Sequence, residues 1–169
     1  MKVILSLLIV LGFASCGYKP SPKFARDIMG EKISTNIIIS AEDPENTVII
    51  KDAVDEAVIT VFHASLRDKA SSDTHLEISI KSTSYSANVY DKDGYVTGYK
   101  MTVNLGITRS HNGISKNYSV SGTYDFTVDA DAAVTDQQRF DAIRYGSAKA
   151  IKSFVAKVSA EGARAKKKE

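Results

Sequence analysis

Cys16 is the residue whose type and position point most clearly to chemistry, because it is the only cysteine and it ends an apolar leader. Lys2 precedes the mostly apolar residues 3–13, and the small residues Ala14 and Ser15 come just before the thiol. A basic start, a short apolar run and small residues form the pattern of a secretory signal peptide. A cysteine directly after them is typical of a bacterial lipobox, in which the thiol is acylated and cleavage makes the cysteine the mature N-terminus.

We therefore predict a lipoprotein signal peptide over residues 1–15. Cys16 is expected to carry diacylglycerol and an N-acyl chain such as palmitate, with no other cofactor. The apolar run is shorter than the roughly 20 residues that span a bilayer, so the lipid would anchor the mature chain. Phe13 stands where a lipobox usually has an aliphatic residue. The alternative is an ordinary secretory signal with an unrelated cysteine, which would leave a free thiol in an exported chain.

The other residues that could take part in catalysis or metal binding do not form a recognisable catalytic set. The three histidines, His63, His75 and His111, have no metal-ligand spacing to one another or to acidic residues. No nucleophile elbow, phosphate loop or dinucleotide fingerprint occurs. We predict a binding or assembly module with no metal and no enzymatic activity, and a hydrolase is a distant alternative.

Four basic residues in the second half of the chain are candidates for binding an anionic group: Lys92, Lys100, Arg109 and Lys116. If they gathered at one end of the fold, they would suit phosphates or anionic head groups. The alternative is a solvated sheet edge protected by lysines. Tyrosines cluster on the same predicted strands and suit an interface; they are Tyr85, Tyr90, Tyr95, Tyr99, Tyr118 and Tyr124.

Charge and composition limit the possible partners. The formal net charge is +2; removal of Lys2 leaves +1, and residues 164–169 contribute +3, so the rest of the mature chain carries −2. This balance argues against nucleic acid as a partner. The length and the 43% hydrophobic content fit a single globular domain.

The first elements that position these residues are a strand and a helix. Residues 33–40 alternate in the manner of a strand, and Pro44 with its acidic neighbours precedes a predicted helix over residues 47–66. Two prolines after Cys16 suggest an extended spacer, so we assign residues 16–32 to the lipid anchor and spacer.

Three strands in a meander should follow: the first at about residues 74–90, the second including residues 99–109 and the third including residues 116–128. The alternation of apolar residues changes phase near residues 82–84, which predicts a bulge. Residues 91–94 and 110–113 are hairpin turns.

A final helix is predicted to begin at Thr135 with a capping box to Gln138 and to end near residues 160–162. Its apolar stripe includes Phe140, Ile143 and Phe154. The fold class is α+β: a two-layer sandwich with a four-stranded, mostly antiparallel sheet and two helices on one face, in the order β-α-β-β-β-α. The domain spans residues 33–160, and residues 161–169 form a basic disordered tail.

These features together resemble the LptE family of lipopolysaccharide-assembly lipoproteins. The resemblance rests on residues 16–18 (Cys-Gly-Tyr), 37–39 with the following Asp43-Pro44, and 89–94 leading to 99–104. The order of elements matches over nearly all of the mature chain.

The resemblance implies a lipid-anchored protein on the periplasmic face of the outer membrane. It implies a plug inside the LptD β-barrel that helps to insert lipopolysaccharide into the outer leaflet and binds the anionic head of this lipid. Lys92 is the nearest match to a basic hairpin residue implicated in that binding. The family lysine expected near Thr135 has no counterpart here. The alternative function is an accessory lipoprotein of another envelope machine, such as a lipid-transporting ABC system or a cell-wall synthase.

Overall fold

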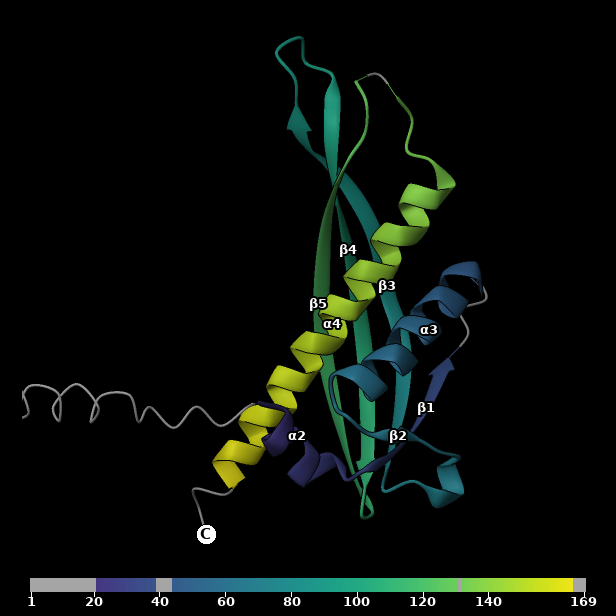
Figure 1. The fold of residues 1–169 in the computed structure, drawn as a ribbon, viewed down its shortest axis with the longest axis vertical. Helices are drawn as coiled ribbons and strands as arrows, with labels where there is room; N and C mark the ends of the chain where they lie inside the picture. The colour runs from purple at the N-terminus through teal and green to yellow at the C-terminus, as the bar shows by residue number, and fades with distance from the viewer. Residues whose placement is uncertain (1–20, 39–43, 131, 166–169) are drawn as a thin grey trace, which may run out of the picture.

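The backbone is organised around one mixed sheet, which the computed structural model shows together with its helices (Figure 1). The structure describes residues 21–38, 44–130 and 132–165, and Cys16 and the predicted signal peptide lie outside these ranges. The sheet has five strands in the order β2-β1-β3-β4-β5. They are β1 (Lys32–Ile38), β2 (Ser65–Leu66), β3 (Thr74–Tyr90), β4 (Val96–His111) and β5 (Ile114–Thr127).

Strand pairing corrects the predicted sheet while keeping its class. The β3, β4 and β5 strands form the expected antiparallel meander, but β1 runs parallel to both β2 and β3. The sheet therefore has five strands rather than four. The β2 strand was missed because two residues are too few to show an alternation in sequence.

The phase change in β3 is a β-bulge. Ile80 pairs with Leu105 and Ser82 pairs with Asn104, so Lys81 is the extra residue. The bulge keeps the apolar side chains on one face, because Ile78 before it and Tyr85 after it both pair with odd-numbered residues of β4. This confirms the predicted bulge.

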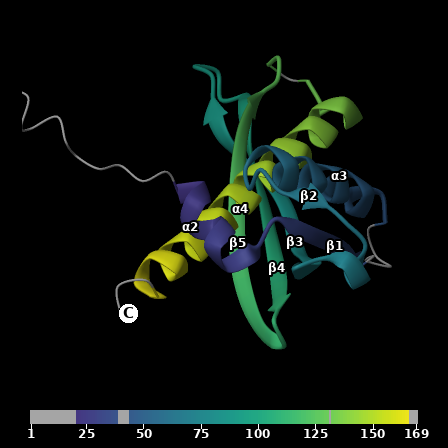
Figure 2. The same cartoon turned by 60° about the horizontal axis from the view of Figure 1, so that its bottom comes forward.

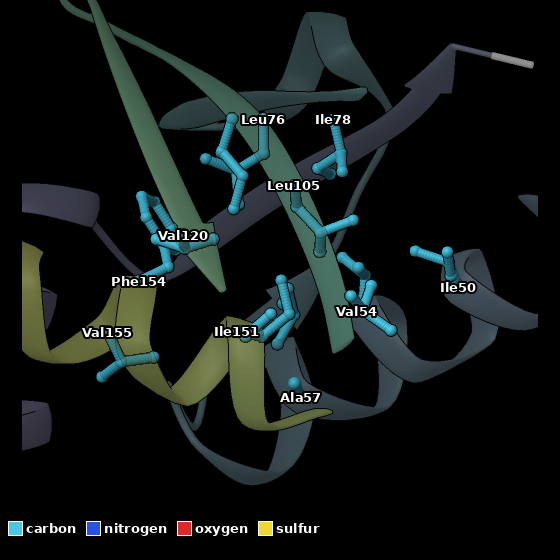
Figure 3. Packing of buried hydrophobic residues seen from close by; sticks show 14 of the residues in the cluster. Ile50, Val54, Ala57, Leu76, Ile78, Leu105, Val120, Ile151, Phe154 and Val155 are labelled. Carbon is cyan, nitrogen blue, oxygen red and sulfur yellow. The ribbon is translucent and has the colours of Figure 1, made fainter. Parts of the chain in front are cut away.

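Two helices, α3 (Pro44–Thr60) and α4 (Asp136–Ala165), cover one face of the sheet (Figure 1). Between them and the strands lies the hydrophobic core, part of which Figure 3 shows, with Val54 and Ile151 from the helices meeting Leu105 from the sheet. The α3 helix ends six residues before the predicted limit of 66, because the chain turns at His63, with φ of 52°, and enters β2.

A third helix, α2 (Ser21–Met29), occupies part of the segment that was predicted to be an extended spacer. Pro22 lies in its first turn, where proline is tolerated, so this proline marks a helix start. Ala25 and Met29 are fully buried, which gives α2 a place in the core. Gly30, with φ of 77°, ends the helix, and the carboxylate of Asp73 accepts the backbone N–H groups of Glu31 and Lys32 at 2.9 Å.

The α4 helix begins as predicted and runs further than predicted. Gln138 N donates to Thr135 Oγ1 at 3.2 Å and Thr135 N donates to Gln138 Oε1 at 3.0 Å, which confirms the capping box. The helix continues to Ala165 because Gly162 is still buried, so residues 161–165 are helical rather than a disordered tail. Phe140 is 42% exposed and is not part of the buried stripe, because the first turn of α4 extends past the core.

The face of the sheet away from α3 and α4, which we call the open face, is polar. Cross-strand hydrogen bonds join Asn104 to Ser82 and Thr108 to Asn117, each at 2.9 Å. This is the pattern expected of a sheet with one wetted face. In the described part of the chain, no helix is both long and apolar enough to cross a membrane.

Candidate binding surface on the distal hairpin

Lys92 lies at the tip of the hairpin that joins β3 to β4. Asp91 Oδ1 shapes this turn by accepting the backbone N–H groups of Asp93 and Tyr95, both at 2.9 Å. Gly94 supplies the left-handed conformation, with φ of 87°. The Lys92 side chain is 89% exposed and its Nζ lies 3.2 Å from Asp93 Oδ2. A surface pair of this kind is weak, so Lys92 remains accessible to an anionic ligand.

Aromatic and aliphatic side chains surround this tip. We call residues 85–99 the distal hairpin; it projects past the helices, as Figure 1 shows. Tyr90 is 58% exposed, and Val89, Tyr95 and Tyr85 are each about half exposed. Exposed rings with polar hydroxyl groups suit a boundary between apolar and polar surroundings.

The base of the distal hairpin is braced by stacked rings. The centroids of Tyr85 and Tyr99 lie 5.6 Å apart in an edge-to-face contact, and Tyr99 stacks on Phe126 at 5.8 Å. These contacts hold the three strands together at the base of the projection. The hairpin is therefore a supported projection that displays Lys92 and its neighbours.

Lys100 lies on the open face of the same half of the sheet. Its Nζ is 3.9 Å from Asp125 Oδ1, which also accepts a hydrogen bond from Asn88 Nδ2 at 2.8 Å. This exposed ion pair is long, and the lysine is 46% exposed. Lys92 and Lys100 therefore share one end of the molecule.

Arg109 and Lys116 lie at the other end, so the structure does not bring the four candidate residues together. Lys100 and Arg109 are nine residues apart on β4, which corresponds to about 30 Å along a strand. Arg109 Nη2 is 3.3 Å and Lys116 Nζ is 2.8 Å from the carboxylate of Glu161. Tyr118 Oη donates to the same carboxylate at 2.7 Å. We call these four residues the Glu161 cluster.

The electrostatics of the Glu161 cluster are those of a structural link between the sheet and α4. Burial acts to raise the pKa of Glu161, but the bonds from Lys116 and Tyr118 and the charge of Arg109 together hold this pKa below its usual value. Burial, and then the bond to Glu161, raise the pKa of Tyr118. Arg109 is only 6% exposed, which leaves little of it for a ligand.

Sequence reasoning missed Lys81, which lies beside a shallow hollow of about 430 Å³ on the open face. A Cβ at Gly106 would lie 2.7 Å from Lys81 Cε and 2.8 Å from Ser79 Oγ, so the lysine stem covers this glycine. The only signal in the sequence was a lysine at the point of the phase change. Among the described residues, no three His, Cys, Asp or Glu residues are grouped so that they could hold a metal ion.

The fold and the distal hairpin define a class of protein: a small α+β module that presents an exposed, partly aromatic hairpin. The model of the family described as LptE, lipopolysaccharide-assembly, matches residues 34–158. The chain belongs to this family, which confirms the resemblance seen in the sequence. It is a family of membrane-associated, non-catalytic accessory lipoproteins of lipopolysaccharide assembly.

A solved structure shares the fold at low sequence identity, and others are similar to this chain. A protein of Xanthomonas campestris is 10% identical, with a TM-score of 0.51 over 81% of this chain and 87% of its own. A minor lipoprotein of Acinetobacter baumannii (11% identity, TM-score 0.45, 78% and 92% covered) is also similar. The rare lipoprotein B of Shewanella oneidensis is similar as well, with 14% identity and a TM-score of 0.42 over 81% of this chain and 94% of its own. No curated protein matches the chain significantly.

Proposed function

We propose that this protein is anchored by lipid on Cys16 to the periplasmic face of the outer membrane, assembles with an LptD-type β-barrel and helps to insert lipopolysaccharide into the outer leaflet. The observation that carries the proposal is the family match over residues 34–158. The leader and Cys16 support the anchor, and the distal hairpin supplies a surface for the lipid and the barrel. The same match disfavours the alternative of an accessory subunit in another envelope machine.

The chemistry of the distal hairpin fits both parts of a lipopolysaccharide molecule. The ammonium group of Lys92 can bind a phosphate or carboxylate of the head group. The exposed rings of Tyr90 and Tyr95 can contact the apolar region beside that head. Lys100, at the same end, adds a second cation.

The four basic candidates therefore take different roles in this proposal. Lys92 is the primary contact to the lipid head, and Lys100 is a secondary one. Arg109 and Lys116 already bind Glu161, so we assign them to stability rather than to direct lipid contact.

Co-purification tests the assembly with a barrel. The protein should be isolated from detergent-solubilised membranes through an affinity tag, and the recovered partners should be identified by mass spectrometry. A large β-barrel protein recovered in near-equal amount would support the proposal. Recovery of the protein alone, or with an inner-membrane transporter, would contradict it.

Charge reversal tests the lipid contact. Lys92→Glu should weaken lipopolysaccharide binding by about tenfold, because an attractive charge becomes a repulsive one. Lys69→Glu is the matched control, since Lys69 is exposed at the opposite end of the sheet beside β2. Equal affinities of the two variants would remove Lys92 from the proposal.

A further inference from the structure

The outer side of the C-terminal half of α4 carries four exposed cations. They are Lys149, Lys152, Lys157 and Arg164, which we call the basic face. At 100° per residue they fall within about 140° of the helix circumference. The cations therefore arise from one side of the helix along four of its turns, and the side chains of Lys149 and Lys157 reach to β5.

Few carboxylates face these cations. Glu56 of α3 lines the same hollow as Lys152, but it pairs with Arg144 Nη2 at 3.3 Å. Within residues 142–165 the only acidic residue is Glu161, and its carboxylate is turned toward Arg109 and Lys116 on the sheet. Lys157 Nζ donates to the backbone oxygen of Ser119 at 2.6 Å, and Lys149 Nζ lies 5.5 Å from the centre of the Tyr124 ring. These partners are uncharged, so they do not offset the charge of either lysine.

The C-terminal part of the basic face, towards Arg164, lies at the end of the molecule that carries α2. The α2 helix packs along the C-terminal part of α4, and the two helices lie side by side in both views (Figures 1 and 2). Cys16 precedes Ser21 by five residues, which can span at most about 18 Å. The α2 helix itself contains Lys23, Arg26 and Asp27, so its side chains sum to a charge of +1.

We infer that the basic face binds the anionic phospholipid head groups of the membrane to which Cys16 is tethered, an inference that rests on the proposed lipid anchor. Each basic residue held near an anionic bilayer strengthens binding severalfold. The lipid on Cys16 and the basic face would then both hold the protein to the membrane, and two such attachments give stable anchoring. The distal hairpin lies at the opposite end of the sheet (Figure 1), so this contact would leave it free for the lipopolysaccharide and the barrel.

Lysine footprinting of the full, naturally processed protein tests this inference. The protein is reconstituted in vesicles of phosphatidylethanolamine and phosphatidylcholine, with or without phosphatidylglycerol, and acetylated briefly. Lys152 should react at least threefold more slowly on the vesicles with phosphatidylglycerol, and added salt should restore its reactivity. Lys69, which is exposed beside β2, should react equally on both. Equal reactivity of Lys152 on both vesicles would overturn the inference.

A pair of matched variants provides a second measurement. Lys152→Glu with Arg164→Glu should lower the fraction bound to phosphatidylglycerol vesicles after salt washing by at least tenfold relative to Arg67→Glu with Lys69→Glu. The control pair reverses the same number of exposed charges beside β2. Equal retention of the two variants would contradict a role for the basic face.

The mass of the N-terminal peptide separates this inference from the proposed anchor. An acylated Cys16 with an unprotected Lys152 would leave the anchor standing and overturn the basic face. An unmodified Cys16 with a protected Lys152 would overturn the lipid anchor and leave the lipid contact of the basic face standing. Protection of Lys152 only when the barrel partner is present would favour an acidic protein surface and would also overturn the inference.

Discussion

Glu161 is the residue that connects the basic end of the sheet to α4. Its carboxylate accepts from Tyr118 and pairs with both Arg109 and Lys116, so one side chain neutralises a buried cation and satisfies a half-buried hydroxyl. Ionised pairs of this kind are costly to break from one side, because the remaining charge stays buried without a partner. Arg109 looked like a ligand-binding residue in sequence, and its 6% exposure makes it a structural one.

We predict that Glu161→Ala lowers the free energy of unfolding by about 3 kcal/mol at neutral pH, because Arg109 is left buried and unpaired. Since the folded-state pKa of Glu161 lies below 4.5, its contribution is present above that pH and is lost as the pH falls through the lowered pKa. Urea denaturation at neutral and acidic pH would measure both effects. If the difference in free energy of unfolding between wild type and variant were the same at acidic and neutral pH, this account would be contradicted.

At the scale of the elements, the contact between α4 and β5 depends on two glycines. A Cβ at Gly122 would overlap the carbonyl oxygen of Gly146 and the nitrogen of Ala150, both in the α4 backbone. The helix can therefore rest directly on the strand. Side chains of α4 also satisfy carbonyl groups of β5: Ser153 donates to Ser121 O at 3.2 Å and Lys157 to Ser119 O at 2.6 Å.

Gly122→Ala is expected to destabilise the fold by about 3 kcal/mol, because the new methyl group meets backbone atoms that cannot move aside. Gly106→Ala is the control, since it lies in the middle of a neighbouring strand and its methyl group meets the flexible end of Lys81 and Ser79 Oγ. The control should change stability by less than about 1 kcal/mol. Equilibrium denaturation measures the stability of both variants. Equal losses of stability in the two would argue against the close approach of α4 to β5.

The bulge at Lys81 leads to a second prediction about elements. Deletion of Lys81 should leave the pairing of Ser82 with Asn104 intact, because it removes only the unpaired residue. Deletion of Ser84 should turn Tyr85 to the open face and destabilise the fold by about 2 kcal/mol more. Thermal or urea unfolding of both deletion variants tests this. Greater damage from the loss of Lys81 would show that the bulge itself is required.

At the scale of the whole molecule, the two ends differ in chemistry. One end carries the distal hairpin with its exposed rings and Lys92, and the other carries α2, the C-terminal part of the basic face and the proposed tether. The long meander connects them, with α4 running along it (Figure 1). This polarity suits a protein that is held at one end and makes its specific contacts at the other.

The replacement of Tyr90 and Tyr95 by serine should therefore reduce recovery of the barrel partner severalfold without affecting the fold. Both side chains are at least half exposed, so each change should alter stability by no more than about 0.5 kcal/mol. Ile114→Ser is the control, because Ile114 is 67% exposed at the opposite hairpin. Co-purification and thermal unfolding provide the two readouts, and undiminished recovery of the partner would remove the hairpin rings from the interface.

Local patterns in the sequence were sufficient for the meander and for the start of α4. Alternation specified the buried residues Met101, Val103 and Leu105, and the capping box placed Thr135 at the helix start. The family resemblance could also be read from short motifs and their order. Each of these signals lies within one element, where periodicity and turn chemistry act directly.

Tertiary structure decided what depends on distant segments. The two-residue β2 strand exists because β1 offers it a partner, and α2 is held because Ala25 and Met29 reach the core. The separation of Lys92 from Arg109, and the pairing of Arg109 with Glu161, follow from strand length and from the path of α4. By itself the sequence determined which residues alternate, turn and cap. Which cations are buried and which are exposed was decided only when α4 packed on the sheet, because burial and pairing of a charge depend on residues far away in the chain.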